Sequence, residues 1–279
     1  MFEVGHPEVQ DAIERALEED IGTGDITSQL TVPEDLPAGG DFLAKQDLVV
    51  AGVEMLPLIY QLRGGAQVTV LSMSGDQAHP GTVLAQVLGP ARLLLACERV
   101  ALNFLQRLSG VATLARTYVD AVAGTGAQIL DTRKTTPGLR RLEKMAARAG
   151  GVINHRQGLF DAVLIKNNHI TAAGGVRQAL ANASAFGGPV EIEVRDRVEL
   201  DQALACRAKH LLLDNLSPAE AAEWIRHIDG RATVELSGGI NLETIRAYAE
   251  ARPNFISCGA ITHSAPAVDI SFRLQLKPI

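Results

Sequence analysis

Basic residues concentrate in one stretch of an otherwise acidic chain. The 279 residues include 26 Lys and Arg against 32 Asp and Glu, which gives a net charge of −6. Between Asp131 and Lys166, however, eight basic residues stand against three acidic ones. Arg binds carboxylates and phosphates through paired hydrogen bonds, and Lys supplies a compact positive charge. The stretch therefore predicts a binding site for a substrate with several anionic groups.

These cations fall into two groups by position. Arg133, Lys134 and Lys166 come directly after predicted strands, where side chains reach a ligand at the edge of a sheet. Four others lie on a predicted helix, where a solvated charged face is the default. These four are Arg140, Arg141, Lys144 and Arg148. We expect the first group to bind substrate and the second to face water.

Two histidines occur in the same region. His155 and Arg156 lie in a glycine-flanked loop, which suits closure on a ligand, although a structural role for His155 is equally open. His169 either touches the substrate or caps the following turn through a ring nitrogen.

Two carboxylates, Glu193 and Asp214, stand at the ends of neighbouring predicted strands. Mg²⁺ is typically held by one or two carboxylates together with substrate oxygens, so a metal carried by a phosphate ligand would explain the pair. Sugar hydroxyls or a cationic transition state would also explain it. An internal salt bridge to Lys166 or Arg133 is the structural alternative.

Glycines follow the last two predicted strands. Ser237-Gly238-Gly239 comes after one strand and Gly259 after the next. Glycine lets backbone N–H groups approach an anion, and the last loops of a barrel often bind phosphate. These positions predict a phosphate cradle.

The scaffold must bring these strand ends together. We predict strands at residues 128–131, 162–165, 190–194, 210–213, 233–236 and 255–257. Helical patterns between them cover residues 139–149, 176–186, 198–207, 218–228 and 242–251. This alternation is typical of a parallel sheet, either open or closed into a barrel. Polar residues follow nearly every strand, and only in a barrel do all such loops converge, so the barrel is favoured.

The first part of the chain does not show this regular alternation of strands and helices. We expect a helix at residues 6–20, then short strands and a helix, and one or two long helices over residues 91–122 with a kink at Ser109-Gly110. The predicted organisation is a small α/β domain at residues 1–108 and an α/β barrel at residues 109–279. With six strand–helix units instead of eight, the barrel is incomplete and TIM-like.

Composition sets further bounds. Hydrophobic residues make up 47% and aromatic residues 4%, so the core must be aliphatic. The net charge and the lack of aromatic motifs disfavour a nucleic-acid or anionic-membrane surface. Cys97, Cys206 and Cys258 never form a CxxC pair, and we expect three buried thiols. No apolar run reaches the length of a membrane span, and we expect a cytoplasmic protein.

Three long motifs occur in order along the chain. They run from Asp131 to Arg140, from Asn154 to Leu159, and from Leu164 to Ile170. With shorter matches such as Glu98-Arg99 and Ile261-Thr262-His263-Ser264, they make the whole chain resemble the quinolinate phosphoribosyltransferase family.

The resemblance implies an N-terminal open-faced α/β sandwich followed by an incomplete α/β barrel. It implies transfer of phosphoribosyl from 5-phosphoribosyl-1-diphosphate to quinolinate with decarboxylation, which gives nicotinate mononucleotide for NAD biosynthesis. It further implies a requirement for Mg²⁺ and a homodimer, in which Arg99 reaches the site of the partner subunit.

The resemblance also implies roles for individual residues. The two quinolinate carboxylates would be held by Arg133, His155, Arg156 and Lys166. Lys134 would lie near the diphosphate, and Glu193 and Asp214 would face the ribose hydroxyls and Mg²⁺. Phosphate would be bound by Ser237, Gly238, Gly239 and Gly259. The expected substrate-binding set also includes Thr132, Ser257 and Cys258, and the expected catalytic residues are Lys134, Lys166, Glu193 and Asp214.

Three positions depart from the family pattern. Asn167 stands where an acidic residue is frequent, Val152 where glycine is frequent, and Leu236 where a small residue is frequent. Two other functions stay open: a related phosphoribosyltransferase-like protein associated with molybdenum transport, and a non-catalytic barrel that binds a phosphorylated metabolite. Both Glu193 and Asp214 are present, which favours the enzyme over the binding protein.

Overall fold

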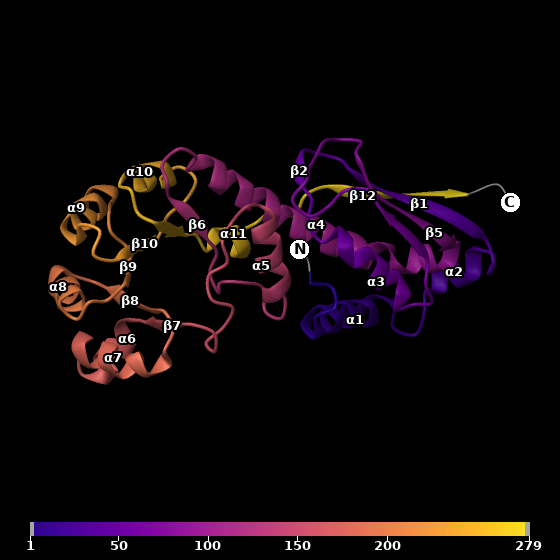
Figure 1. The fold of residues 1–279 in the computed structure, drawn as a ribbon. Helices are drawn as coiled ribbons and strands as arrows, with labels where there is room; N and C mark the ends of the chain where they lie inside the picture. The colour runs from indigo at the N-terminus through magenta and orange to yellow at the C-terminus, as the bar shows by residue number, and fades with distance from the viewer. Residues whose placement is uncertain (1–2, 277–279) are drawn as a thin grey trace. The chain divides into compact units, whose positions relative to one another are not determined.

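The computed structural model describes residues 3–276, which form two compact units (Figure 1). The N-terminal unit combines the chain up to Arg116 with Thr135–Gly151 and the chain from Thr262 onward. The barrel unit combines Thr117–Lys134 with Val152–Ile261. A single cut between residues 108 and 109 therefore does not separate the units, because later segments return to the first one.

The N-terminal unit contains an antiparallel sheet in the order β12-β1-β5-β3. Its strands are β1 (Pro37–Ala44), β3 (Gln67–Val70), β5 (Val83–Pro90) and β12 (Ile270–Leu276). A short ribbon pairs β2 (Leu48–Val49) with β4 (Gln77–Ala78). The helices are α1 (Pro7–Ile21), α2 (Ile26–Thr31), α3 (Leu56–Gln61) after the 3-10 turn Val53–Met55, and α5 (Arg140–Ala149).

Local sequence signals account for α1. Pro7 occupies the first turn, and Nδ1 of His6 accepts a hydrogen bond from the backbone N–H of Glu8 at 3.2 Å. Val9, Ile13 and Leu17 are fully buried at helical spacing. The predicted helix at residues 6–20 is confirmed.

The pairing of β12 with β1 joins a strand near the C-terminal end of the described residues to a strand in the first part of the chain. Its register runs from Ala44 opposite Ile270 to Ala38 opposite Leu276. The rings of Phe42 and Phe272 lie 4.9 Å apart, and a Cβ at Gly40 would overlap the Phe272 ring. The sequence analysis assigned this segment to the barrel domain, because no local pattern reveals a strand partner more than 200 residues away.

The helix α4 (Ala91–Ala121) is continuous, so one long helix is present where one or two were expected, and the predicted kink at Ser109-Gly110 does not interrupt it. The two residues serve packing instead. Ser109 Oγ accepts a hydrogen bond from the backbone N–H of Ala51 at 3.0 Å. A Cβ at Gly110 would lie 2.1 Å from the carbonyl oxygen of Pro266, so only glycine lets that backbone approach the helix.

The barrel unit contains a parallel sheet in the order β6-β11-β10-β9-β8-β7 within the described residues (Figure 1). Its strands are β6 (Gln128–Leu130), β7 (Val163–Ile165), β8 (Val190–Val194), β9 (His210–Asp214), β10 (Thr233–Ser237) and β11 (Phe255–Ser257). Neighbours follow chain order from β7 to β11, and the first strand, β6, pairs with the last. This cyclic order is that of a barrel left unclosed between β6 and β7, which confirms the predicted incomplete barrel.

Helices alternate with these strands. They are α6 (Asn167–Ala173), α7 (Val176–Ala183) with the 3-10 turn Ser184–Phe186, α8 (Arg197–Ala205), α9 (Pro218–Ile228), α10 (Ile245–Glu250) and α11 (Ala260–His263). The α9 prediction has the same bounds as the helix, because Ser217 and Glu220 form a capping box and Pro218 occupies the first turn. The short α6 and α11 were not predicted.

Two burial predictions need correction. Lys144 was expected to face water, but it is only 2% exposed, whereas Arg148 on the same helix is exposed. Cys97 and Cys258 are buried as expected, but Cys206, which ends α8, is half-buried. Among residues 3–276, no helix combines the length and apolarity needed to cross a membrane.

Candidate active site

The predicted binding residues of the barrel unit gather at the carboxyl ends of its strands. Parallel pairing sets these ends side by side: Ser237 is opposite Asp214, and Val194 is opposite Leu213. Thr132, Arg133 and Lys134 follow β6, and Lys166 follows β7. Arg99 belongs to the N-terminal unit, where it is exposed on α4.

An ion pair joins two of the expected catalytic residues. Lys166 Nζ lies 3.1 Å from Oε2 of Glu193, whose side chain is 8% exposed against 48% for the lysine. The internal salt bridge considered from the sequence is therefore present. Because a buried carboxylate is costly without a partner, Lys166 makes the position of Glu193 tolerable.

The surroundings of Asp214 contain the same groups. Burial raises the pKa of this carboxyl, and the charge of Glu193 raises it further. Lys166, a hydrogen bond from Ser237 and Lys134 act in the opposite direction on the pKa. The four expected catalytic residues thus lie within electrostatic reach of one another.

A buried aspartate, Asp131, anchors the loop that carries His155. It is 0% exposed. Its carboxylate accepts hydrogen bonds from Asn154 Nδ2 at 2.6 Å and from the backbone N–H of His155 at 2.8 Å. The 131–134 and 154–156 motifs are therefore held together at the end of β6.

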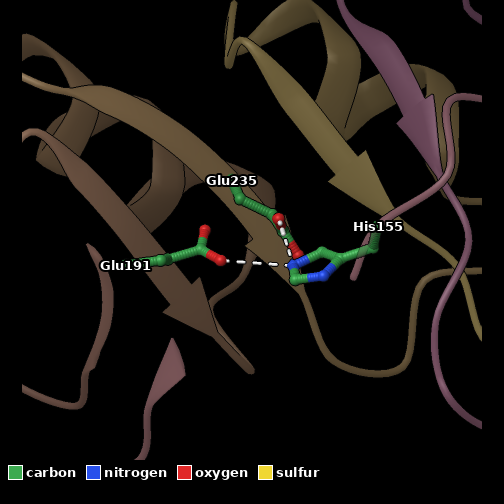
Figure 2. A group of neighbouring side chains, drawn as sticks. All are labelled: His155, Glu191 and Glu235. Atoms are coloured by element: carbon green, nitrogen blue, oxygen red, sulfur yellow. Dashed lines mark hydrogen bonds and ion pairs between the residues drawn. The ribbon is translucent and has the colours of Figure 1, made fainter. Parts of the chain in front are cut away.

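The imidazole of His155 meets two carboxylates (Figure 2). Its Nε2 lies 3.2 Å from Glu191 Oε2 and 3.5 Å from Glu235 Oε2. Burial lowers the pKa of His155, but the hydrogen bonds and charges of both carboxylates outweigh burial and raise it to about 9. The backbone N–H of Arg156 donates a hydrogen bond to Nδ1 at 2.7 Å, a contact that favours the neutral ring and is lost when Nδ1 is protonated.

The sequence analysis missed Glu191 and Glu235. Burial raises the pKa of Glu191, His155 lowers it, and the charge of Glu235 raises it again. A strand periodicity of two was the available signal, since Glu191 shares a strand face with Glu193, and Glu235 shares one with Ser237. These three ligand-type side chains could also hold a metal ion.

The cluster predicts a pH dependence of stability. The pKa of His155 is about 9 in the fold against 6.5 for an ordinary histidine. Its stabilising contribution is therefore complete below pH 6.5 and is lost as the pH rises through 9. In Glu235→Gln the pKa of His155 falls, so less stability should be lost over this range in a pH series of unfolding midpoints. The exposed pair of His227 with Asp201 supplies the control, His227→Gln, and identical pH series for wild type and Glu235→Gln would contradict the assignment.

Two guanidinium groups face the same region. Arg156 Nη1 donates to the carbonyl oxygen of Ala162 at 3.1 Å. Burial lowers the pKa of Arg156, and the charge of Arg133 lowers it further. Two neighbouring cations repel one another, so an anion bound between them would be stabilised by both.

The predicted phosphate loops differ in what they offer. Gly238 and Gly239 have φ values of 95° and 62°, a left-handed conformation that turns successive N–H groups toward one side. Cys258 is 1% exposed, and its N–H donates to the carbonyl oxygen of Leu130 at 3.0 Å. The thiol of Cys258 is therefore buried, and its N–H is already hydrogen-bonded.

Two local hydrogen bonds order the first residues of the loops that follow β6 and β7. His169 Nδ1 accepts from the backbone N–H of Lys166 at 2.9 Å, so the capping alternative for His169 is the one present. Thr132 Oγ1 accepts from the backbone N–H of Lys134 at 3.0 Å. Both side chains thereby order the backbone next to a lysine that the sequence analysis expects to be catalytic.

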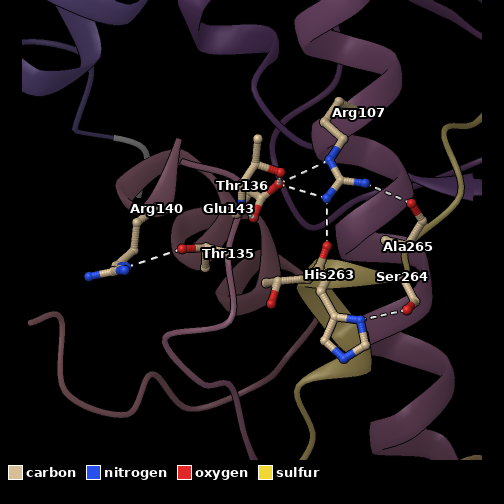
Figure 3. Close-up of polar contacts among 9 residues, drawn as sticks. Arg107, Thr135, Thr136, Arg140, Glu143, His263, Ser264 and Ala265 are labelled. Atoms are coloured by element: carbon tan, nitrogen blue, oxygen red, sulfur yellow. Dashed lines mark hydrogen bonds and ion pairs between the residues drawn. The ribbon is translucent and has the colours of Figure 1, made fainter. Parts of the chain in front are cut away.

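The chain beyond Lys134 enters the N-terminal unit, where hydrogen bonds and an ion pair hold it in place (Figure 3). Glu143 is 0% exposed and accepts hydrogen bonds from Arg107 Nη2 at 2.7 Å and from Thr136 Oγ1 at 2.7 Å. Arg107 Nη1 also donates to the carbonyl oxygen of Ala265 at 2.7 Å. This ion pair between a half-buried arginine and a buried glutamate connects α4, α5 and the C-terminal segment to the loop at Thr135–Thr136.

Comparisons with known proteins agree along the whole chain. Family models of quinolinate phosphoribosyl transferase match residues 25–109 with the N-terminal domain and residues 111–273 with the C-terminal domain. The probable nicotinate-nucleotide pyrophosphorylase (carboxylating) of Bacillus subtilis is 38% identical, over 98% of this chain and 96% of its own. The chloroplastic nicotinate-nucleotide pyrophosphorylase (carboxylating) of Arabidopsis thaliana is 39% identical, over 97% of this chain and 84% of its own.

Solved structures give the same result. The nicotinate-nucleotide pyrophosphorylase from Francisella tularensis has a TM-score of 0.91 at 37% identity and covers 96% of both chains. NadC from Streptococcus pyogenes has a TM-score of 0.92 at 35% identity, over 97% of this chain and 98% of its own. The matching motifs, barrel and relatives together place the chain in the quinolinate phosphoribosyltransferase family.

Proposed function

We propose that the protein transfers phosphoribosyl from 5-phosphoribosyl-1-diphosphate to quinolinate and decarboxylates the product to nicotinate mononucleotide, a step of NAD biosynthesis. The observation that carries the proposal is the gathering of opposite charges at one barrel edge. Arg133, Arg156 and His155 supply positive charge for a dianionic aromatic acid, and Glu193 and Asp214 supply negative charge beside it. The relatives bear the names of this activity.

The reaction needs positioning and charge more than it needs a nucleophile. The ring nitrogen of quinolinate forms a bond to ribose C1 while the bond from C1 to the diphosphate oxygen breaks, and the diphosphate leaves with the electron pair. The developing positive charge at C1 would be stabilised by the carboxylates of Glu193 and Asp214. Lys134 would meet the departing diphosphate.

Decarboxylation follows from the charge on the ring. The 2-carboxylate leaves as carbon dioxide, its bonding electrons stay on C2 as a carbanion that the adjacent cationic ring nitrogen stabilises, and this electron pair then takes a proton from water at C2. Arg133, Arg156 and Lys166 would hold the two carboxylates so that the ring lies in line with C1. The N–H groups of Gly238 and Gly239 would bind the phosphate of the ribose.

We propose Mg²⁺ as the cofactor, bound together with the diphosphate. Glu193 and Asp214 offer the oxygen ligands that Mg²⁺ prefers, and the repulsion that raises the pKa of Asp214 would be relieved by a divalent cation. The residues therefore fit the metal. When bound, it would neutralise charge on the leaving group.

We also propose a homodimer in which the exposed Arg99 of α4 completes the site of the partner subunit; the expected cytoplasmic location stays a prediction. Mixing inactive Arg99→Ala and Lys166→Ala proteins should restore part of the activity, because a hybrid dimer rebuilds one complete site. Subunit exchange is verified by tagging each variant differently. No recovery in proven hybrids would contradict the shared site.

The activity is tested by release of labelled carbon dioxide from quinolinate carrying the label in its 2-carboxylate. Release should require 5-phosphoribosyl-1-diphosphate and Mg²⁺ together. Folded protein that binds both substrates without release would point to a binding barrel. Turnover of a different aromatic acid would point to the molybdenum-associated relative.

A further inference from the structure

Asn215 has an unusual backbone conformation for a residue that follows a strand. Its φ is 57°, in the left-handed region that non-glycine residues seldom adopt. Within residues 3–276, the other non-glycine residues with positive φ are Arg207, Asp229 and Arg252. All three come at or just after helix ends, where a left-handed residue is common, whereas Asn215 directly follows the end of β9 at Asp214.

This conformation gives Asn215 contacts in two directions. Its backbone N–H donates to the carbonyl oxygen of Ser237 at 2.9 Å, so the pairing of β9 with β10 continues one residue beyond Asp214. Its side-chain Nδ2 donates to Asp214 Oδ2 at 2.6 Å. The residue therefore fixes both a strand end and the carboxylate on it.

Asn215 also fits against the glycine loop after β10. A Cβ on Gly238 would lie 2.4 Å from Asn215 Oδ1 and 2.5 Å from its backbone nitrogen. The absence of a side chain at Gly238 thus makes room for Asn215. Contacts among Asp214, Asn215 and Gly238 therefore join the loop after β9 to the loop after β10. The proposed function assigns both loops to the same substrate.

The residue type suits this place. Asparagine tolerates the left-handed region better than most residues and donates a hydrogen bond without adding charge. Aspartate would tolerate the backbone but would set a third carboxylate beside Glu193 and Asp214. Glycine would keep the backbone and lose the amide.

We propose that Asn215 is a positioning residue for the phosphoribosyl donor, which holds the Asp214 carboxylate and the Gly238 loop in one arrangement. This inference rests on the proposed function, because it takes Asp214 and Gly238 to bind the ribose and its phosphate. Quinolinate is held by other residues. Loss of Asn215 should therefore weaken donor binding selectively.

The test is Asn215→Gly, which retains the backbone conformation and removes the amide. Loss of a hydrogen bond to a charged group predicts a rise of about 10- to 100-fold in KM for 5-phosphoribosyl-1-diphosphate. The Kd for quinolinate, measured by calorimetry without donor, should change less than about twofold. Asn215→Asp, which keeps the size of the side chain, should raise the donor KM as well and shift its Mg²⁺ dependence. Asp229→Gly is the matched control, since Asp229 is also left-handed but caps α9.

A second measurement does not depend on turnover. Gly238→Ala should lower the unfolding midpoint, and the loss should be smaller when Asn215 is Gly, because the clash with the Asn215 side chain is then removed and only that with the backbone nitrogen remains. An unchanged donor KM in both Asn215 variants overturns the proposal, and so does a loss of affinity shared equally by donor and quinolinate. If wild-type protein releases no carbon dioxide, the proposed function has failed. The combined effect of Gly238→Ala and Asn215→Gly on the unfolding midpoint then still tests the contact between these two residues. If the two effects are simply additive, that contact is overturned.

Discussion

Replacing Lys166 by Met should lower kcat/KM for quinolinate about a thousandfold while the protein stays folded. The side chain is 48% exposed, so its hydrophobic stem contributes little to the core. Its ammonium group, however, pairs with Glu193 at 3.1 Å and lowers the pKa of Asp214. The variant loses a cation for the substrate carboxylate and leaves the nearly buried carboxylate of Glu193 without its ion-pair partner.

The measurement is kcat/KM together with the Kd for quinolinate in the absence of donor. Lys166→Arg keeps the charge and should retain part of the activity. Lys209→Met is the matched control, because Lys209 is exposed and precedes β9, at the amino end of a strand in the same sheet. Normal quinolinate affinity in Lys166→Met would remove this lysine from the substrate site.

Replacing Glu143 by Ala should lower the free energy of unfolding by about 3–5 kcal/mol. The carboxylate is 0% exposed and is bonded by Arg107 and by both the N–H and the hydroxyl of Thr136 (Figure 3). Its removal leaves the guanidinium without its counter-ion and the two Thr136 donors without their acceptor. Activity should fall too, because Thr136 lies two residues beyond Lys134.

Urea denaturation measures this loss. Glu143→Gln keeps the shape and one acceptor, and should fall between wild type and Glu143→Ala. Glu250→Ala is the control, because its pair with Arg246 is exposed and such pairs are worth at most about 0.5 kcal/mol. A loss below about 1 kcal/mol in Glu143→Ala would show that the pair is not fully desolvated.

The barrel could be predicted from the sequence because the patterns that indicate its strands and helices are local. The predicted strands at residues 190–194 and 255–257 have the observed bounds, and those of β9 and β10 were one residue short. Buried parallel strands appear as short apolar runs, and the helices between them carry their own caps. The charged residues at strand ends were readable for the same reason.

The errors concern contacts between distant segments. The strand β12 depends on a partner far along the chain, and the packing of Ser109 against Ala51 and of Gly110 against Pro266 does so too. The buried Lys144 was misjudged because helix charges usually face water.

The sequence by itself determined the barrel, the family and the loops that carry the chemistry, because each is a matter of local pattern and residue type. Only the tertiary structure decided how the side chains pair. It joined Lys166 to Glu193, set His155 between Glu191 and Glu235, and placed Asn215 against Gly238. Such pairings depend on strand order and register, which bring together residues that no spacing along the chain connects.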